Sequence, residues 1–452
     1  MGKNYLNLFH SFSFLFLFLS FSFPFPSEAY DRLAEMTDTY GSRLSGSTAL
    51  EQAIDWVVGK MHADNSFDKV ITEDVSTAHW VRGREHVKML QPRSHNLTML
   101  GLGMSIGTGP AGITAEVIVV KDFVELANRS SEVAGKIVVY NAPYVSYSET
   151  GVYRRIGAQE AAKYGALASI TRSISPFSLD TPHTGNMEPA SIPAAAISIE
   201  DAELLQRFQD RGERIVINLF MEAHFLTDFT SRNIVADYLG TTHPEQVVVI
   251  GGHIDSWDVG TGALDDGGGL MVAWEAVRLM ANLGIRAKRT IRVVMWTNEE
   301  NGAKGSDVYF ANRRDQMDDH VMAIESDGGV FAAFGIGFSG VEPAFQILTE
   351  IGQNYLAFIG AGNVTRGGGG RDIDPLCAIS VPCAGLNDLD FNRPDKTDNY
   401  FNYHHTKADT MSAIRRDEID SNVAGMGVWA FAVADLEEDL PRGTYLYVPE
   451  KD

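Results

Sequence analysis

Three segments decide the fold of this chain: QVVVIGG (246–252), GLMVAWEAVRLMANLG (269–284) and TIRVVMW (290–296). The first and third are short apolar runs rich in β-branched residues, which are typical of strands buried on both faces of a mostly parallel sheet. In the middle segment Leu270, Ala273, Val277 and Met280 recur at helical spacing. We therefore expect a β-α-β unit within an α/β fold, with helices covering the sheet.

Imidazole and carboxylate side chains follow the apolar runs directly. His253 and Asp255 come after the first run, Glu299 and Glu300 after the second, and Asp327 after a further run, VMAI. In open α/β sheets ligands bind at the carboxyl ends of the strands, so one crevice could collect these groups. Imidazoles and carboxylates together suit a hard-to-borderline cation. The sequence thus indicates a metal-dependent hydrolase.

Two further segments carry side chains of the same chemistry. TGALDDGGG brings Asp265 and Asp266, and YFNYHHTKADT brings His404 and His405. An isolated Glu-Glu pair after a strand is usually part of a solvated loop. With four other ligand segments present in the chain, the pair after TIRVVMW is better explained as part of a site.

Composition excludes some classes of function. The chain has 452 residues, enough for two or three domains, and its 44% hydrophobic content is globular rather than disordered. Its net charge of −22 argues against nucleic-acid binding, which depends on basic patches.

The N-terminus has the parts of a secretory signal peptide, which we expect to span residues 1–29. Lys3 precedes an apolar stretch that ends in small residues. A membrane anchor is the alternative, but Pro24 and Pro26 interrupt the stretch before a full span of roughly 20 apolar residues. We expect a secreted or lysosomal protein with no stable membrane insertion once the signal is removed. Three glycosylation sequons fit this route: Asn96, Asn128 and Asn363.

Two cysteines occur, Cys377 and Cys383. They form either a small disulfide loop or a pair of buried thiols, and the sequence leaves both interpretations open.

The pattern along the chain indicates one hydrolase domain interrupted by an insertion. Residues 30–111 would be the N-terminal part of the hydrolase domain, and 229–452 the remainder. Between them, 112–228 is a series of short β-like runs with no expected cluster of metal ligands.

Four motifs together resemble the M28 family of zinc exopeptidases: GGHIDSWDVGTGALDDGGG, WTNEENG, ESDGG and HHTKADT. The resemblance covers the chain from about Tyr30 onward. It implies the zinc exopeptidase fold, a mixed, mostly parallel sheet with helices on both faces. It also implies that residues 112–228 are a protease-associated-like domain, that the protein is a homodimer, and that each chain binds two Zn²⁺ ions.

The resemblance also assigns roles to the metal-ligand residues. Asp265 would bridge the two zinc ions. Glu300 and His405 would complete one metal site, and His253 and Asp327 the other.

Two residues next to these ligands would serve catalysis. Glu299 would be the general base, and Asp255 would hold the imidazole of His253. The resemblance further implies a cis peptide bond between Asp265 and Asp266.

Two candidate substrate contacts have alternative explanations. His404 could replace its neighbour as the metal ligand, but the spacing to Asp409 and Thr410 favours His405, which leaves His404 to contact substrate or to pack. Arg371 could pair with a substrate carboxylate or simply lie on the surface.

The predicted function is hydrolysis of dipeptides or short peptides by a di-zinc exopeptidase of carboxypeptidase or dipeptidase type. An aminopeptidase would share the same metal core. A non-catalytic receptor or binding protein would be expected to lose ligands, and none of the five is missing. A single-zinc acyltransferase or cyclase is a third alternative. A serine hydrolase is disfavoured, because the Gly-x-Ser-x-Gly at 103–107 is followed by GTGPAG, which cannot begin a helix cleanly.

Overall fold

A computed structural model describes residues 27–177, 179–388 and 400–443 of the chain. The chain forms two compact units. Of the described residues, the first unit comprises 27–77, 230–388, 400 and 410–443, and the second unit comprises 78–177, 179–229 and 401–409.

The expected signal peptide lies outside the described residues as far as residue 26. The first described helix, α2 (Ala29–Tyr40), begins where the expected signal ends. Among the helices that the structure describes, none combines the length and the apolar character needed to cross a membrane.

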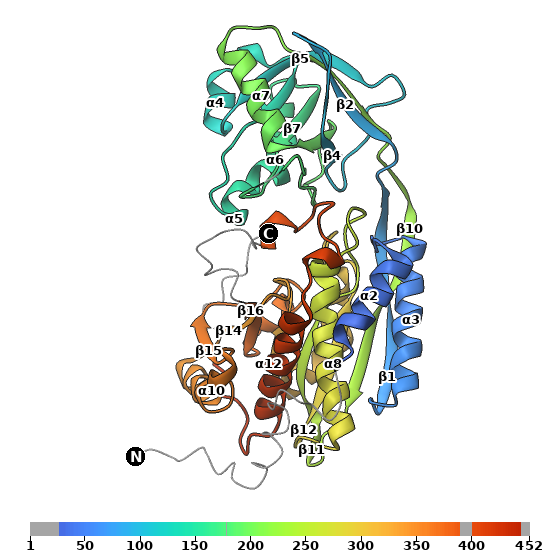
Figure 1. The fold of residues 1–452 in the computed structure, drawn as a ribbon, viewed down its shortest axis with the longest axis vertical. Coiled ribbons are helices and arrows are strands. Elements are labelled where there is room, and N and C mark those ends of the chain that lie inside the picture. The colour runs from blue at the N-terminus through green and yellow to red at the C-terminus, as the bar shows by residue number, and fades with distance from the viewer. Residues whose placement is uncertain (1–26, 178, 389–399, 444–452) are drawn as a thin grey trace. The chain divides into compact units, whose positions relative to one another are not determined.

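An eight-stranded mixed sheet forms the centre of the first unit (Figure 1). Its strands, in spatial order, are β1 (Lys69–Val81), β10 (His224–Tyr238), β12 (Arg289–Trp296), β11 (His243–His253), β13 (His320–Glu325), β16 (Cys383–Asp388), β14 (Ala333–Ser339) and β15 (Asn363–Arg366). The four central strands β12, β11, β13 and β16 are parallel. β10 and β14 flank them in the antiparallel direction, and β15 runs parallel to β14. The mostly parallel sheet is confirmed.

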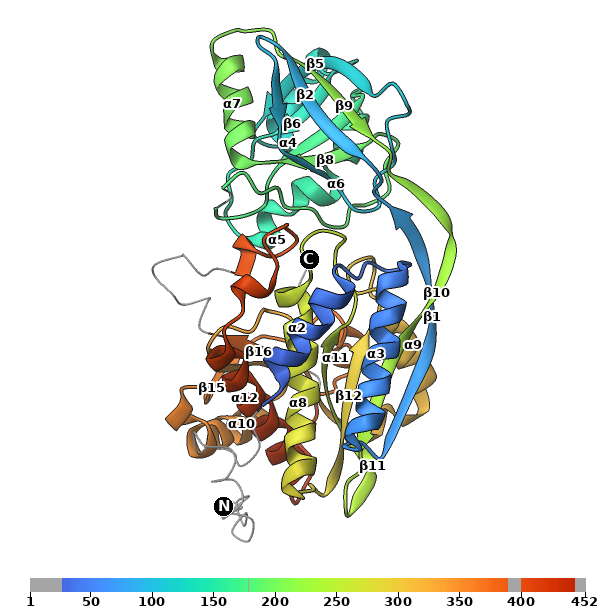
Figure 2. The same ribbon diagram turned by 45° about the vertical axis from the view of Figure 1, so that its right-hand side comes forward.

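Helices cover the sheet of the first unit. They are α2, α3 (Thr48–Asp64), α8 (Gly268–Leu283), α9 (Lys304–Asn312), α10 (Glu342–Tyr355), α11 (Asp374–Cys377) and α12 (Arg416–Ala434). α8 and α12 lie side by side and both contact β11 and β12 (Figure 1). α2 packs against α8 and α3 (Figure 2).

The β-α-β prediction is confirmed, and burial explains why these residues form these elements. Every residue of β11 from Val247 to His253 is buried, as expected for a strand covered on both faces. Val247 and Val249 join residues of α9 and α11 in one core cluster. Because alternate residues of a strand face opposite sides, the residues between them face the other layer. α8 is buried from Gly268 to Met280, which suits its apolar sequence.

The second unit contains another eight-stranded sheet. Its strands, in spatial order, are β3 (His95–Leu97), β2 (Glu85–Gln91), β9 (Val216–Met221), β5 (Ile113–Val120), β6 (Ile137–Tyr140), β7 (Ala168–Arg172), β8 (Ala194–Ile197) and β4 (Met99–Gly101). Its helices are α4 (Phe123–Asn128), α5 (Tyr147–Thr150), α6 (Val152–Ala162) and α7 (Ile199–Asp210).

The expected boundary at residue 112 differs from the structure, where the second unit begins at Ala78. The reason is long-range strand pairing. β2 pairs with β9 and β4 pairs with β8, so strands before residue 112 belong to the sheet of the inserted unit.

The two cysteines form a disulfide bond, with a Cα–Cα distance of 5.7 Å. Cys377 ends α11 and Cys383 begins β16, and both belong to the core cluster beneath the sheet. The alternative of two buried thiols is therefore not what the structure shows.

Candidate metal centre

The carboxyl ends of three parallel strands meet at one edge of the first unit's sheet. His253, the last residue of β11, is level with Trp296, the last residue of β12, and Gly251 is level with Glu325, the last residue of β13. Side chains that follow these strands are therefore brought together, as the sequence pattern predicts.

The His253 ring lies at the centre of a buried group of carboxylates. Its Nε2 is 3.1 Å from Oδ1 of Asp265 and 3.6 Å from Oδ1 of Asp327. Ligand atoms of His253, Asp265 and Glu300 all lie within 4.8 Å of one another, and the same holds for His253, Asp266 and Asp327. The structure thus brings together four of the five expected metal ligands.

The hydrogen bonding of His253 makes this group suitable for a cation. Its Nδ1 lies 2.9 Å from the main-chain oxygen of Asp255, which can only accept, so Nδ1 carries a hydrogen. In the neutral ring the Nε2 lone pair then faces two carboxylates, an arrangement that needs a proton or a metal ion between them. Burial opposes a charge on the ring, but the bonds to Asp265 and Asp327 outweigh it and raise the His253 pKa well above its ordinary value. One imidazole and several carboxylates fit a divalent ion such as zinc.

Asp255 acts differently from the expectation that its carboxylate holds the imidazole. The Asp255 carboxylate is 3.8 Å from Nδ1 of His253, beyond hydrogen-bond distance. Its two oxygens instead accept from the Ser45 hydroxyl and from the main-chain N–H of Glu299, both at 3.1 Å. Asp255 is fully buried, and burial raises its pKa. The ring is held by the backbone, and the carboxylate fixes the turn that carries Glu299.

Asp266 is also bound by the backbone. Its carboxylate accepts the main-chain N–H groups of His253 and Gly269, at 3.0 and 3.1 Å. Burial is the main cause that raises the pKa of Asp266 well above its ordinary value, and Asp327 adds to it. The peptide bond between Asp265 and Asp266 is cis, as the resemblance implies.

Arg43 forms hydrogen bonds with the loop that joins His253 to Asp265. This fully buried side chain donates to the carbonyl oxygens of Ile254, Thr261 and Gly262, at 2.9, 2.7 and 3.0 Å. Sequence reasoning did not single out Arg43. The segment around it, YGSRLSGS, has no pattern that predicts a buried guanidinium.

Glu299 and Glu300 lie on the turn after β12. Glu300 is buried, whereas Glu299 is half-buried. The preceding residue, Asn298, has a left-handed φ of 67°. The two neighbouring carboxylates therefore lie in different surroundings, as two separate roles require.

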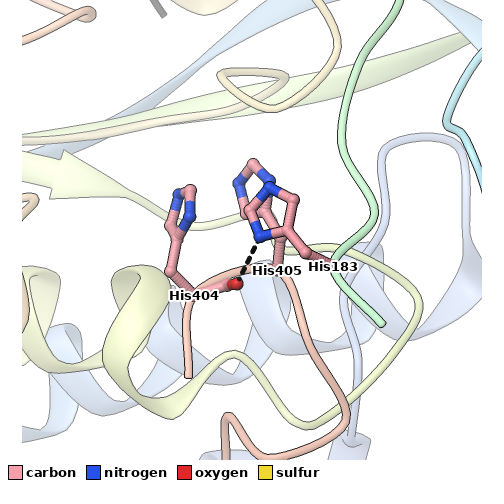
Figure 3. A group of neighbouring side chains, drawn as sticks. All are labelled: His183, His404 and His405. Atoms are coloured by element: carbon pink, nitrogen blue, oxygen red, sulfur yellow. Dashed lines mark hydrogen bonds between the residues drawn. The ribbon is translucent and has the colours of Figure 1, made fainter. Parts of the chain in front are cut away.

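His405 belongs to the second unit, where it stacks on His404 with ring centroids 3.6 Å apart. His183 of the inserted segment stacks on His405 at 5.0 Å, and its Nδ1 is 3.0 Å from the His404 carbonyl oxygen (Figure 3). Ligand atoms of the three rings lie within 4.8 Å of one another. The sequence predicted no such group here, because a lone histidine in DTPHTGN carries no local signal.

The other expected residues are placed as follows. Nη1 of Arg371, a partly exposed side chain, lies 3.5 Å from the Asp374 carboxylate. Ser105 of the Gly-x-Ser-x-Gly motif is buried and its hydroxyl accepts the Ala194 N–H, so it is not a nucleophile on a strand-to-helix turn. The sequon residues Asn96, Asn128 and Asn363 are exposed.

A mixed α/β fold that gathers an imidazole and carboxylates at one sheet edge is the arrangement expected of a metal-dependent hydrolase. A family model described as Peptidase family M28 matches residues 233–429. This chain belongs to peptidase family M28 and is a metallopeptidase.

Among its relatives, human carboxypeptidase Q is 45% identical over 420 residues, covering 92% of this chain and 87% of that protein. Bovine carboxypeptidase Q has the same identity and coverage. The solved peptidase M28 precursor from Shewanella amazonensis SB2B is 32% identical, with a TM-score of 0.84 over 92% of this chain and 95% of that one. The zinc aminopeptidase of Bacillus subtilis, 19% identical with a TM-score of 0.69, covers 92% of this chain and 98% of its own and shares the fold.

Proposed function

We propose that this chain is a di-zinc exopeptidase that hydrolyses dipeptides or short peptides, of the carboxypeptidase or dipeptidase type. The observation that carries the proposal is the His253 Nε2 atom facing the carboxylates of Asp265 and Asp327. Without a cation or a proton, this buried arrangement of lone pairs is repulsive.

The proposed ligands follow the M28 resemblance. His253 and Asp327 would hold one zinc ion, Glu300 and His405 the other, and Asp265 would bridge them. When bound, the two ions supply a Lewis acid and lower the pKa of a water molecule. Three carboxylates and two neutral imidazoles balance most of the charge of two dications.

Glu299 is the proposed general base. It takes a proton from the attacking water and later delivers it to the leaving amine. Its half-buried position allows proton exchange, and the hydrogen bond from its N–H to Asp255 fixes the turn that carries it.

The carboxypeptidase type is favoured over the aminopeptidase type by the comparisons. The carboxypeptidase Q relatives are 43–45% identical across 92% of this chain. A probable leucine aminopeptidase from Arthroderma benhamiae is 24% identical over 65% of it. The aminopeptidase structures are similar in fold alone.

Dipeptide hydrolysis with and without a chelator tests the reaction. Substrates blocked at either terminus distinguish the two exopeptidase types. We expect cleavage of dipeptides with a free C-terminus, poor cleavage of C-blocked ones, loss of activity with the chelator, and about two zinc ions per chain. Cleavage of N-blocked dipeptides would indicate the carboxypeptidase type, and a requirement for both free termini the dipeptidase type. Glu299→Gln should lower kcat by roughly 100-fold or more, since general-base catalysis contributes about 10²–10⁴-fold.

Glu350→Gln is the matched control, because Glu350 is exposed on α10 in the same unit. It should keep wild-type activity. Hydrolysis that survives chelation, or that Glu299→Gln leaves intact, contradicts the mechanism. A single zinc ion per chain would favour the acyltransferase or cyclase alternative.

We further propose a secreted or lysosomal homodimer with a protease-associated-like second unit. The disulfide supports passage through an oxidising compartment. The exposed sequons Asn96, Asn128 and Asn363 are the proposed glycosylation sites. Light scattering of the purified protein and its mass before and after deglycosylation test these assignments.

A further inference from the structure

The second unit contains a buried arginine, Arg154, whose charge has no carboxylate partner in the part of the chain that the structure describes. Arg154 lies on α6 and is 2% exposed. Its side-chain hydrogen bonds to described residues all involve one nitrogen, Nη1. This atom donates to the Tyr147 hydroxyl at 2.6 Å and to the main-chain carbonyl oxygen of Thr184 at 3.4 Å. It also lies 3.0 Å from Nε2 of His183 and 3.4 Å from Nδ1 of His405.

Among the described residues, no aspartate or glutamate forms an ion pair with Arg154, and its Nε is buried without a hydrogen-bond partner. Three other buried or partly buried arginines do have partners for their charge or their N–H groups. Arg292 and Arg313 pair with carboxylates at 2.6 and 2.7 Å, and Arg43 donates through three nitrogens to carbonyl oxygens. A buried charge without a counter-ion is strongly unfavourable, so Arg154 is suited to receive an anion.

The three histidines around Arg154 do not form a cation site of their own. Nδ1 of His183 faces the His404 carbonyl oxygen and therefore carries the hydrogen (Figure 3). Its remaining acceptor, Nε2, faces the Arg154 guanidinium. A metal ion bound there would compete with a fixed positive charge.

The backbone at Gly185 makes room for the guanidinium. A Cβ atom there would lie 2.1 Å from Nη1 of Arg154 and 2.9 Å from Nδ1 of His405, and Gly185 has a φ of +139°. A side chain at this position would displace Arg154. Because Gly185 has no side chain, Nη1 of Arg154 can reach the imidazoles. The Nε–Nη2 edge of the guanidinium forms no hydrogen bond with the described residues.

We propose that Arg154 forms an anion site that binds one carboxylate group through its Nε–Nη2 edge. Two parallel N–H donors match the two oxygens of a carboxylate. Tyr147, which is half-buried, packs against the same guanidinium and gives the site an aromatic wall. The carboxylate has two possible sources, the C-terminus of a peptide substrate or a free organic acid. The first source rests on the proposed peptidase function.

Titration calorimetry with 3-phenylpropionate and 3-phenylpropionamide tests the site in the full-length chain. Neither probe has a peptide bond that exopeptidase action would cleave, so binding is independent of hydrolysis. We expect the wild type to prefer the acid, and Arg154→Met to weaken acid binding roughly tenfold to hundredfold, as for a lost charge-assisted hydrogen bond. Arg129→Met should retain the preference, because Arg129 pairs with Glu125 and Glu132 in the same unit.

Equal binding of acid and amide by the wild type overturns the proposal without any variant. Unchanged acid binding by a folded Arg154→Met also overturns it. If that variant unfolds, Arg154→Gln takes its place, and folding is followed by circular dichroism. Binding of inorganic phosphate that depends on Arg154, without binding of the acid, overturns the carboxylate assignment.

Hydrolysis of dipeptides with a free or amidated C-terminus identifies the source. A higher KM for the free acid in Arg154→Met, with loss of preference over the amide, identifies the substrate carboxylate. If Arg154→Met no longer binds 3-phenylpropionate but still prefers the dipeptide with a free C-terminus, the natural ligand of the site is a free organic acid. If the wild type binds the acid but cleaves no peptide, the peptidase proposal fails and the site stands.

Discussion

At the scale of single residues, the metal centre depends on glycines as well as on its ligands. A Cβ atom at Gly252 would lie 1.9 Å from Oδ2 of Asp266, and one at Gly269 would lie 2.3 Å from Oδ1 of the same carboxylate. Asp266 in turn accepts the main-chain N–H of His253. The glycines of GGH and DDGGG therefore let a buried carboxylate approach the backbone that carries the imidazole.

Gly252→Ala should displace Asp266 and lower both zinc content and stability. We expect a loss of about 1–3 kcal/mol in the free energy of unfolding, the usual range for overpacking. Gly59→Ala is the control, because Gly59 is in helix α3 with no atom within 4 Å of the added Cβ. It should stabilise the protein by about 0.5–1 kcal/mol. Urea unfolding and zinc analysis measure both effects. Wild-type zinc content and stability in Gly252→Ala would contradict this account.

Residue types predicted the place of the site better than the role of each side chain. The sequence could place His253, Glu300 and Asp327 near one another, because each follows an apolar run whose end lies at the same sheet edge. The hydrogen-bond partners of Asp255 could not be predicted from the sequence, since they depend on the conformation of two loops. His183 gave no signal, because its neighbours His404 and His405 are more than 200 residues away along the chain.

At the scale of elements, the loop between β11 and α8 is fixed by a segment from the N-terminal part of the chain. Arg43 binds three of its carbonyl oxygens, and Ser45 binds the Asp255 carboxylate. The main-chain groups of Arg43 also bond to Ser256. The positions of His253 and Asp265 relative to each other therefore depend on a strand-free segment about 210 residues earlier in the sequence.

Arg43→Lys should weaken zinc binding without unfolding the protein. A lysine has one donor nitrogen and cannot reach three separate carbonyls at once. Loss of groups that orient metal ligands typically lowers metal affinity by roughly 10- to 100-fold, and we expect the same here. Arg286→Lys, which alters an exposed arginine paired with Asp68, should leave affinity unchanged. Competition with a zinc chelator measures both variants. Equal zinc affinity in Arg43→Lys would show that the loop holds its shape alone.

Hydrophobic periodicity predicted the central elements but not how the sheet continues beyond them. The expected helix at 269–284 is observed as α8, Gly268–Leu283, and the run 321–324 lies in β13. The order β13-β16-β14-β15 and the antiparallel direction of β10 and β14 are not visible in any local pattern. They arise from pairing between strands that are far apart in sequence.

At the scale of the whole molecule, the insertion is larger than its composition suggested. The sequence changes character near residue 112, but the second unit begins at Ala78 and includes 401–409. Short strands such as β3 and β4 have only three residues each, too few to show an alternating pattern. β4 joins the sheet through β8, which lies about 100 residues later in the chain. β3 joins it through β2, whose other partner, β9, is about 130 residues later.

The disulfide bond stabilises the fold and needs an oxidising compartment in which to form. Cys377 and Cys383 join α11 to β16, the strand next to β13, whose end leads to Asp327. Closing a loop with a sequence separation of 6 should stabilise the protein by about 2 kcal/mol on the chain-entropy account. The expected route through the secretory pathway would let this bond form, whereas a reducing cytosol would not.

Urea unfolding with and without a thiol reductant isolates the contribution of this bond. The wild type should lose about 2 kcal/mol in the reductant. The Cys377→Ala/Cys383→Ala variant is expected to start less stable and to be insensitive to the reductant. Comparing each protein with itself removes the effect of the smaller side chains, because that effect is present in both buffers. A wild type whose unfolding midpoint is the same in both buffers, under conditions where free thiols are detected, would show that the core, not the bond, holds β16 beside β13.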